Sequence, residues 1–214
     1  MSPYYQNELV KIFNGDSMEV MPTIKDITLV LCDPPYGLNK KMSGGSWGIK
    51  YKHGDMMEWD YLLRPEHIDL LLATGTEQMI WGANHYRMPP SRCWIAWIKP
   101  LMPTLSTVEL AWTSIDAPAK YIKHNRMEAK NHPTEKPLPV MEFCLQMSRT
   151  TGLVCDPFLG SGTTAVACMK NNRPCVGIET SERHCETSAK RCEEYITGLS
   201  IDEQDSGQTL LFEE

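Results

Sequence analysis

The sequence predicts one α/β domain in three layers around a mainly parallel sheet. Two observations support this prediction. Apolar runs of strand length alternate with segments of helical periodicity, as where "ITLVLC" is later followed by "PEHIDLLLATG". Towards the other end, "GLVCDPFLGSGTTAVACMKNN" has the form of a strand, a glycine loop and a helix. We expect this single domain to span residues 1–199.

In chain order, the first elements are two strands separated by a short helix. The strand "ELVKIFNGD" ends at Asp16, and "SMEVMPTI" is expected to form the helix. The second strand, "ITLVLC", lacks polar alternation, which is typical of a strand buried on both faces. It ends at Asp33, before two prolines. A helix over "PEHIDLLLATG" would end at Gly75. Its inward side is predicted to hold Ile68, Leu71 and Leu72.

Strand candidates and helices also alternate in the second half. "EQMIWGANHY", "RCWIAWIKP" and "STVELAWTS" are strand candidates separated by proline-containing turns. The prolines of "NHPTEKPLPV" exclude a place inside a sheet. The helix after it has Val140, Cys144 and Met147 at helical spacing. "PCVGIETSERHCETSAKRCEEYI" predicts a strand ending at Glu179 and a last helix. The inward residues predicted for that helix are Cys185, Ala189, Cys192 and Ile196.

The composition is that of an ordinary globular chain, with 42% hydrophobic and 22% charged residues among 214. The N-terminal segment has no basic region followed by a long apolar stretch, and no run reaches the roughly 20 apolar residues of a membrane helix. We therefore expect a cytoplasmic protein. The eight cysteines are scattered without a C-x-x-C pair. We interpret them as reduced core residues and expect no metal site.

The formal net charge of −6 is unevenly distributed along the chain. Residues 200–214 hold five acids and no base, and we expect them to form a flexible acidic tail. The rest is nearly neutral and contains two basic segments, within residues 37–60 and 119–132. Glycines and aromatics among the lysines favour a loop at 37–60 that faces nucleic acid, against the alternative of scattered solvated lysines. The candidate nucleic-acid-binding residues are Lys40, Lys41, Lys50, Lys52, Lys123 and Arg126.

The loop "DPFLGSGTT" predicts a site for an adenosine-containing cofactor. Gly160 and Gly162 let the backbone pass close to a ligand, and the helix that follows offers free N–H groups to an anion. A nucleotide-hydrolysing loop would need a lysine before its Ser or Thr, and this loop has none. Glu179 follows Gly160 by nineteen residues, a spacing at which an acid accepts hydrogen bonds from ribose hydroxyls. The alternative is a glycine turn with a surface glutamate.

The stretch "DPPY" at the end of the buried strand suits methyl transfer to an exocyclic amine. Such an amine is a poor nucleophile because its lone pair is delocalised into the base. The Asp33 carboxylate and the Pro34 carbonyl could accept its two N–H protons, which would turn the lone pair towards a sulfonium methyl. Pro35 stiffens this turn, and Tyr36 would stack on a base swung out of the helix. The alternative is a structural Asp-Pro turn.

Together, these motifs resemble those of S-adenosylmethionine-dependent DNA amino-methyltransferases, over roughly residues 8–197. "DPPY" is similar to the catalytic motif of that family and "DPFLGSGTT" to its cofactor motif. "GIE" is similar to its acidic ribose-binding strand end, and "HPTEKP" to the segment before the cofactor motif. The catalytic motif comes first, as in the β class. The resemblance therefore implies a circularly permuted, Rossmann-like methyltransferase sheet and an enzyme of DNA methylation, as in restriction-modification.

The resemblance also implies a role for individual residues. Asp16 would hold the adenine amino group of S-adenosylmethionine, and Glu179 its ribose. The implied catalytic residues are Asp33, Pro34, Pro35 and Tyr36. The remaining implied cofactor-binding residues are His132, Thr134 and Lys136 near the methionine carboxylate, and Asp156, Phe158, Gly160, Ser161, Gly162 and Thr163. Asn84 and His85 are candidates for contact with the target base, with a structural turn as the alternative.

The predicted reaction is methyl transfer to N6 of a flipped adenine in DNA, because D-P-P-Y more often marks adenine in this family. The alternative within the family is N4 of cytosine. A non-catalytic DNA-binding partner of the same fold and a nicotinamide oxidoreductase are the alternatives from other classes. Many relatives carry a long target-recognition region before "HPTEKP". This chain does not, so target reading would fall to residues 115–131, to the loop at 37–60 or to a second copy of the chain.

Two partners besides DNA are predicted. Relatives of the β class often pair, which favours a homodimer. The end of the tail, "GQTLLFEE", resembles the short peptide by which replication proteins dock on a bacterial sliding clamp, here through Gln208, Leu211 and Phe212. Such a tether would raise the local concentration of the enzyme on DNA. The alternative is an aliphatic cluster that covers the enzyme's own surface.

Overall fold

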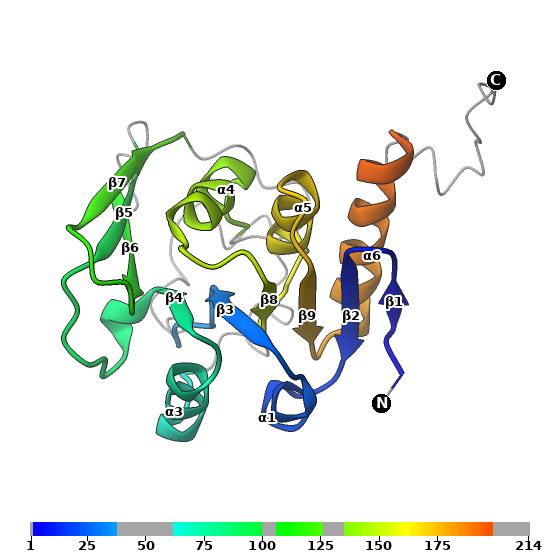
Figure 1. The fold of residues 1–214 in the computed structure, drawn as a ribbon, viewed down its shortest axis with the longest axis horizontal. Coiled ribbons are helices and arrows are strands. Elements are labelled where there is room, and N and C mark those ends of the chain that lie inside the picture. The colour runs from blue at the N-terminus through cyan, green and yellow to red at the C-terminus, as the bar shows by residue number, and fades with distance from the viewer. Residues whose placement is uncertain (1, 38–61, 100–105, 126–134, 199–214) are drawn as a thin grey trace, which may run out of the picture.

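The structure is a computed structural model. It describes residues 2–37, 62–99, 106–125 and 135–198 (Figure 1). Nearly all of the loop predicted at residues 37–60, part of the segment at 115–131 and the whole tail at 200–214 lie outside the described residues.

A single sheet forms the middle layer, with nine strands among the described residues in the order β1-β2-β9-β8-β3-β4-β6-β5-β7 (Figure 1). The strands are β1 (Tyr5–Gln6), β2 (Val10–Asn14), β3 (Ile27–Cys32), β4 (Glu77–Trp81), β5 (Trp94–Ile98), β6 (Val108–Thr113), β7 (Lys120–Lys123), β8 (Leu153–Asp156) and β9 (Cys175–Glu179). The five central strands from β2 to β4 are parallel, while β1 and β6 run antiparallel to their neighbours. The predicted α/β sheet is confirmed, with β3 before β8 in the chain.

Helices cover both faces of this sheet (Figure 1). One face carries α4 (Leu138–Met147), α5 (Thr163–Lys170) and α6 (Glu182–Thr197), and the other carries α1 (Ser17–Val20) and α3 (Pro65–Ala73). Leu29 and Leu31 of β3 enter the first core, and Val30 and Cys32 enter the second. Both faces of β3 are thus buried, which explains the absence of polar alternation in "ITLVLC". Within the described residues, no helix has both the length and the apolar character needed to cross a membrane.

The eight cysteines are all buried and free. Cys144 packs in the first core beside Val140, and Cys32 in the second beside Val30. Burial in apolar surroundings raises the pKa of the Cys144 thiol to about 12, which keeps it protonated and unreactive at neutral pH. The interpretation of these residues as reduced core residues is therefore confirmed.

The element predictions differ from the structure in two respects. The sequence patterns do not predict β1 or β7. β7 pairs with β5 inside the segment predicted for target recognition, and lysines at both of its ends conceal its strand character. The inward placement of Ile196 is wrong, because its side chain is 54% exposed. The last turns of α6 extend beyond the ends of the strands that α6 covers, so no core lies beneath them (Figure 1).

Replacing Leu31 by Ala should lower the free energy of unfolding by about 2–5 kcal/mol, because its fully buried side chain lies in the middle of the sheet. Urea unfolding followed by circular dichroism measures this loss. Ile196→Ala, at the exposed end of α6, is the control and should change the free energy by less than about 1 kcal/mol. Equal effects at the two positions would contradict the placement of β3.

Candidate active site

The candidate site lies at the carboxyl ends of the parallel strands. β8 pairs with β3 so that Cys155 lies opposite Val30. Asp156 and Asp33 therefore emerge from neighbouring strands, whose axes are about 5 Å apart. From these two strands the chain crosses over in opposite directions, from β3 to β4 and from β8 to β9. This is the switch point at which open α/β sheets bind ligands.

The "DPPY" turn after β3 is held by aromatic neighbours. The Tyr36 hydroxyl donates a hydrogen bond to Oδ1 of Asp33, and the Tyr86 hydroxyl donates one to the carbonyl oxygen of Pro35. The Tyr36 ring stacks on the His85 ring, with centroids 5.0 Å apart and planes at 23°. His85, a candidate for contact with the target base, thus lies beside this turn.

Gly82 makes room for the Tyr36 ring. It follows β4 in the left-handed conformation, with φ of 65°, and begins the short turn Ala83–His85 that carries His85. A Cβ atom at position 82 would lie 1.9 Å from Cε1 of Tyr36. Only glycine allows both the backbone turn and the close approach of the ring.

A buried network of charges surrounds Asp33. The Lys136 ammonium lies 2.5 Å from Oδ2 of Asp33 and 3.0 Å from Oε2 of Glu109, on β6. Lys99 also donates a hydrogen bond to Glu109. Lys136 is only 6% exposed and Lys99 only 4%. The sequence prediction placed Lys136 with the cofactor residues near the methionine carboxylate, whereas in the structure its ammonium contacts the catalytic candidate Asp33.

The network shifts the pKa values of its members. Burial raises the pKa of Asp33, and the nearby charge of Lys136 offsets this only in part. Burial alone would also raise the pKa of Glu109, but the ammonium groups of Lys136 and Lys99 outweigh it and lower the pKa to about 2. Burial would lower the pKa of Lys136, but the Asp33 and Glu109 carboxylates outweigh it and raise the pKa. Glu109 and Lys136 are therefore both charged at neutral pH.

The glycine loop after β8 is bound to the end of β9. The Gly160 N–H donates to Oε2 of Glu179 at 2.9 Å, so two of the predicted cofactor-binding residues are in contact. Gly160 and Gly162 have φ of 55° and 86°, which glycine adopts without strain. A Cβ atom at Gly162 would also lie 2.9 Å from the Ser188 side chain of α6. The loop is thus a compact turn bound to the Glu179 carboxylate and to the Ser188 side chain.

Asp156 is the buried acid at the start of this loop. Its Oδ1 accepts a hydrogen bond from the Phe158 N–H at 3.0 Å, and its Oδ2 accepts one from the Thr164 hydroxyl. Burial raises the pKa of Asp156 to about 7, and the charges of Asp33 and Glu179 contribute in the same direction. Asp156 fixes the shape of the loop through these bonds.

Two charged residues that the sequence prediction missed lie at the amino end of α5. Arg191 of α6 donates to the carbonyl oxygen of Ser161 at 2.7 Å and to the Thr163 hydroxyl at 3.2 Å. It also forms an ion pair of 2.8 Å with Glu135. Arg191 therefore holds the predicted cofactor residues Ser161 and Thr163 in place.

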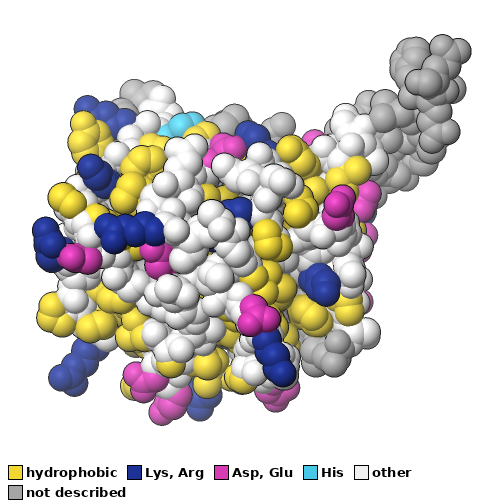
Figure 2. All heavy atoms as spheres, viewed as in Figure 1, with side chains coloured by type: hydrophobic (Ala, Val, Ile, Leu, Met, Phe, Trp, Pro, Cys, Tyr) yellow, Lys and Arg dark blue, Asp and Glu magenta, His cyan; other side chains and the backbone are white. Residues whose placement is uncertain are grey.

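Of the remaining predicted residues, Asp16 lies at the carboxyl end of β2, one strand beyond Glu179, Lys123 lies on β7, and ten lie outside the described residues. Asp16 follows β2, next to β9, and accepts a hydrogen bond from the Met18 N–H at 2.8 Å as the N-cap of α1. Lys123 is exposed on β7 at the far edge of the sheet, and Figure 2 shows several Lys and Arg side chains over this end of the molecule. The predicted residues outside the described ranges are Lys40, Lys41, Lys50, Lys52, Arg126, His132, Thr134, Gln208, Leu211 and Phe212.

Glu109 and Lys99 were also missed, although the sequence contains a signal for each. Glu109 is the one acid in the apolar run "VELAWT", and Lys99 directly follows the apolar run "WIAWI". A charge within or next to a buried strand needs a partner. The partner, Lys136, is distant in the sequence, so the pattern alone does not identify it.

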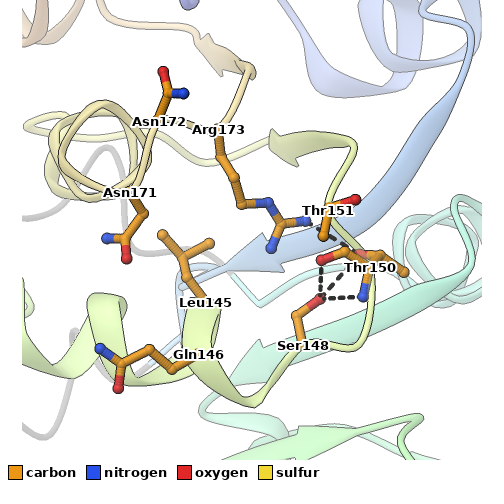
Figure 3. A pocket seen from close by; sticks show the side chains of 8 residues that line it. All are labelled: Leu145, Gln146, Ser148, Thr150, Thr151, Asn171, Asn172 and Arg173. Carbon is orange, nitrogen blue, oxygen red and sulfur yellow. Dashed lines mark hydrogen bonds between the residues drawn. The ribbon is translucent and has the colours of Figure 1, made fainter.

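A polar cavity of about 380 Å³ lies at the opposite end of the parallel strands, where β8 and β9 begin (Figure 3). Its lining residues are Leu145, Gln146, Ser148, Thr150, Thr151, Asn171, Asn172 and Arg173. The Arg173 guanidinium is bonded inside the protein, to the Thr150 hydroxyl and the Gly152 carbonyl. This cavity is separate from the carboxyl ends of the strands, where the predicted motifs lie.

Solved structures of DNA methyltransferases share this fold. A complex of M1.HpyAVI with SAM superimposes with a TM-score of 0.56 and 21% identity, covering 86% of this chain and 99% of the other. The PvuII DNA methyltransferase, which is cytosine-N4-specific, gives a TM-score of 0.59 and 17% identity, covering 97% and 96%. At these identities the similarity establishes the class of fold.

Sequence comparison identifies the family. The Type II methyltransferase M.SmaI of Serratia marcescens is 40% identical over 94 residues, which are 37% of this chain and 32% of that relative. The match to this relative thus spans about a third of its length. A family model for N6/N4 DNA methylases matches residues 76–190, more than half of the chain. The chain belongs to this DNA methylase family.

The raised pKa of Asp156 predicts a specific dependence of stability on pH. Between its ordinary value of 3.8 and about 7, the folded protein binds a proton that the unfolded chain has lost. The free energy of unfolding should therefore fall as the pH rises through this window and then level off. Asp156→Asn removes this dependence on pH. The free energy of unfolding of the variant should therefore rise relative to that of the wild type across the window, by up to about 4 kcal/mol.

Urea unfolding of both proteins from pH 4 to 8, without cofactor, measures the difference. Asp69→Asn changes an exposed acid on α3 and is the control, with a curve parallel to that of the wild type. Parallel curves for Asp156→Asn and the wild type would contradict the burial of a protonated Asp156.

Proposed function

We propose that this chain is a DNA methyltransferase that transfers a methyl group from S-adenosylmethionine to the exocyclic N6 of a flipped adenine. One observation carries the proposal: the "DPPY" turn and the glycine loop follow the neighbouring strands β3 and β8. A single small molecule can therefore contact both. Membership of the N6/N4 DNA methylase family supports the same reaction class.

The glycine loop has the chemistry needed for the cofactor. Gly160 leaves space for a ligand where a side chain would stand, and the Glu179 carboxylate beside it has lone pairs for ribose hydroxyls. Asp16, at the end of the next strand, is in reach of the adenine end. When bound, S-adenosylmethionine supplies an electrophilic methyl group.

The residues after β3 would prepare the amine. Asp33 and the Pro34 carbonyl accept its two N–H groups, which withdraws the lone pair from the base and stabilises the positive charge that develops on nitrogen. The bond from Tyr86 to the Pro35 carbonyl fixes the backbone of this turn. Tyr36 offers its ring for stacking on the extruded base.

The choice of adenine rests on the motif. The fold is compatible with either base, since a cytosine-N4-specific enzyme is among the solved structures that share it. D-P-P-Y more often accompanies adenine in the resembling family, and Asp33 to Tyr36 match it at every position. Homodimer formation and binding to a sliding clamp stay predictions from the sequence.

Asp33→Ala should reduce turnover by about 10²-fold or more, because it removes a preorganised acceptor from the amine. Lys136 keeps Glu109 as a partner, and binding of S-adenosylmethionine, measured by calorimetry, should be retained. Asp69→Ala, at an exposed position of α3, is the control with full turnover. Unchanged turnover in Asp33→Ala would remove the proposed role of Asp33.

Genome-wide mapping of modified bases in a host that expresses the chain should find N6-methyladenine in a defined sequence context. Methyl groups only on N4 of cytosine would overturn the choice of adenine while retaining the amine chemistry. Binding of S-adenosylmethionine and DNA without any methylation would instead favour a non-catalytic partner.

A further inference from the structure

Both oxygens of the Asp33 carboxylate are engaged within the protein. Oδ1 accepts the Tyr36 hydroxyl, and the Lys136 ammonium lies 2.5 Å from Oδ2. The substrate amine of the proposed function needs one of these oxygens. It also becomes positively charged during transfer, and a second cation at the same oxygen would oppose that charge. Lys136 therefore stands where the amine has to bind.

Lys136 cannot leave Asp33 for water. Its side chain is 5% exposed, and the rings of Tyr36 and Trp81 lie 5.6 and 5.4 Å from its nitrogen. A buried ammonium without a partner is strongly unfavourable. An exchange at Asp33 thus requires a second acid within reach of the same nitrogen.

Glu109 is that acid. Its Oε2 lies 3.0 Å from the Lys136 nitrogen, and Lys99 donates to the same carboxylate. β6 runs antiparallel to β4, with Trp81 opposite Ala111, so Glu109 near the start of β6 lies at the edge where β4 ends. Glu109 can therefore hold Lys136 without a large movement of the backbone.

We propose that Lys136 occupies the place of the substrate amine on Asp33 until the entering base displaces it. Glu109 is then the positioning residue that holds the displaced Lys136 ammonium. This inference rests on the proposed function of the site. The exchange transfers no proton: Lys136 stays an ammonium, and the amine replaces it as the donor to Asp33.

The pH dependence of turnover distinguishes this role from a structural one. Turnover needs the ionised Asp33 and falls as the pH drops through its pKa, which Lys136 lowers. Among the described residues, the charged or titratable groups around Asp33 are Lys136, Glu109, Lys99, Tyr36, Tyr86, His85, Cys32 and Asp156. In Lys136→Met, the pH at which turnover falls on the acid side of the profile should move up by about one unit or more. Above that pH, kcat should not fall below the wild-type value, because the competitor of the amine is gone.

Glu109→Gln should lower kcat at least about tenfold at the same high pH, because Lys136 then loses its second partner and stays on Asp33. In the Lys136→Met background, the same substitution should have no further effect on kcat. Glu142→Gln is the matched control, since Glu142 pairs with Lys170 at 3.0 Å on the surface of α4 and α5. It should leave kcat unchanged.

The substrate is DNA that carries the methylated context found by mapping, and calorimetry with S-adenosylmethionine verifies folding. A kcat of Lys136→Met that is tenfold low at every pH would overturn the proposal, as would equal losses from Glu109→Gln in both backgrounds. If Glu109→Gln does not fold, the pH profile of Lys136→Met decides alone. Failure of the wild type to bind S-adenosylmethionine or to methylate DNA would instead refute the proposed function.

Discussion

The pairing of β3 with β8 is the constraint on which the site depends. These strands are distant in the sequence, and their parallel register brings the "DPPY" turn and the glycine loop to one edge of the sheet. Each loop alone is a common turn. Helices on both faces bury β3 completely, so this central strand is held by apolar packing on either side.

The electrostatics of the site follow from this burial. Four charged side chains, Asp33, Glu109, Lys99 and Lys136, share a region with little access to water. Each charge is tolerated only because an opposite charge lies within hydrogen-bonding distance. The pKa of Asp156 on the neighbouring strand is raised to about 7 because burial outweighs the hydrogen bonds that it accepts from Thr164 and Phe158. Burial thus raises the pKa of both acids at the ends of β3 and β8, but at Asp33 the charge of Lys136 offsets part of this rise.

Local patterns in the sequence predict much of the fold and part of the site. β3 and the strand–glycine–helix unit around Gly160 are visible because apolar runs and glycines report local backbone preferences. The contact of Gly160 with Glu179 follows from spacing within one unit. The partners of Glu109 and Arg191 could not be predicted, because they come from segments that only the tertiary fold brings near. Ile196 fits the helical period but lies beyond the sheet, and periodicity carries no information about where a sheet ends.

The close fit between Gly82 and Tyr36 makes two distant positions interdependent. Any side chain at 82 would occupy the volume of the ring, so the glycine can change only after residue 36 has become smaller. An engineer who wished to alter the end of β4 would therefore have to replace the aromatic ring first. A library at position 82 alone would sample mostly misfolded sites, whereas joint variation with position 36 opens a different shape for the nucleobase.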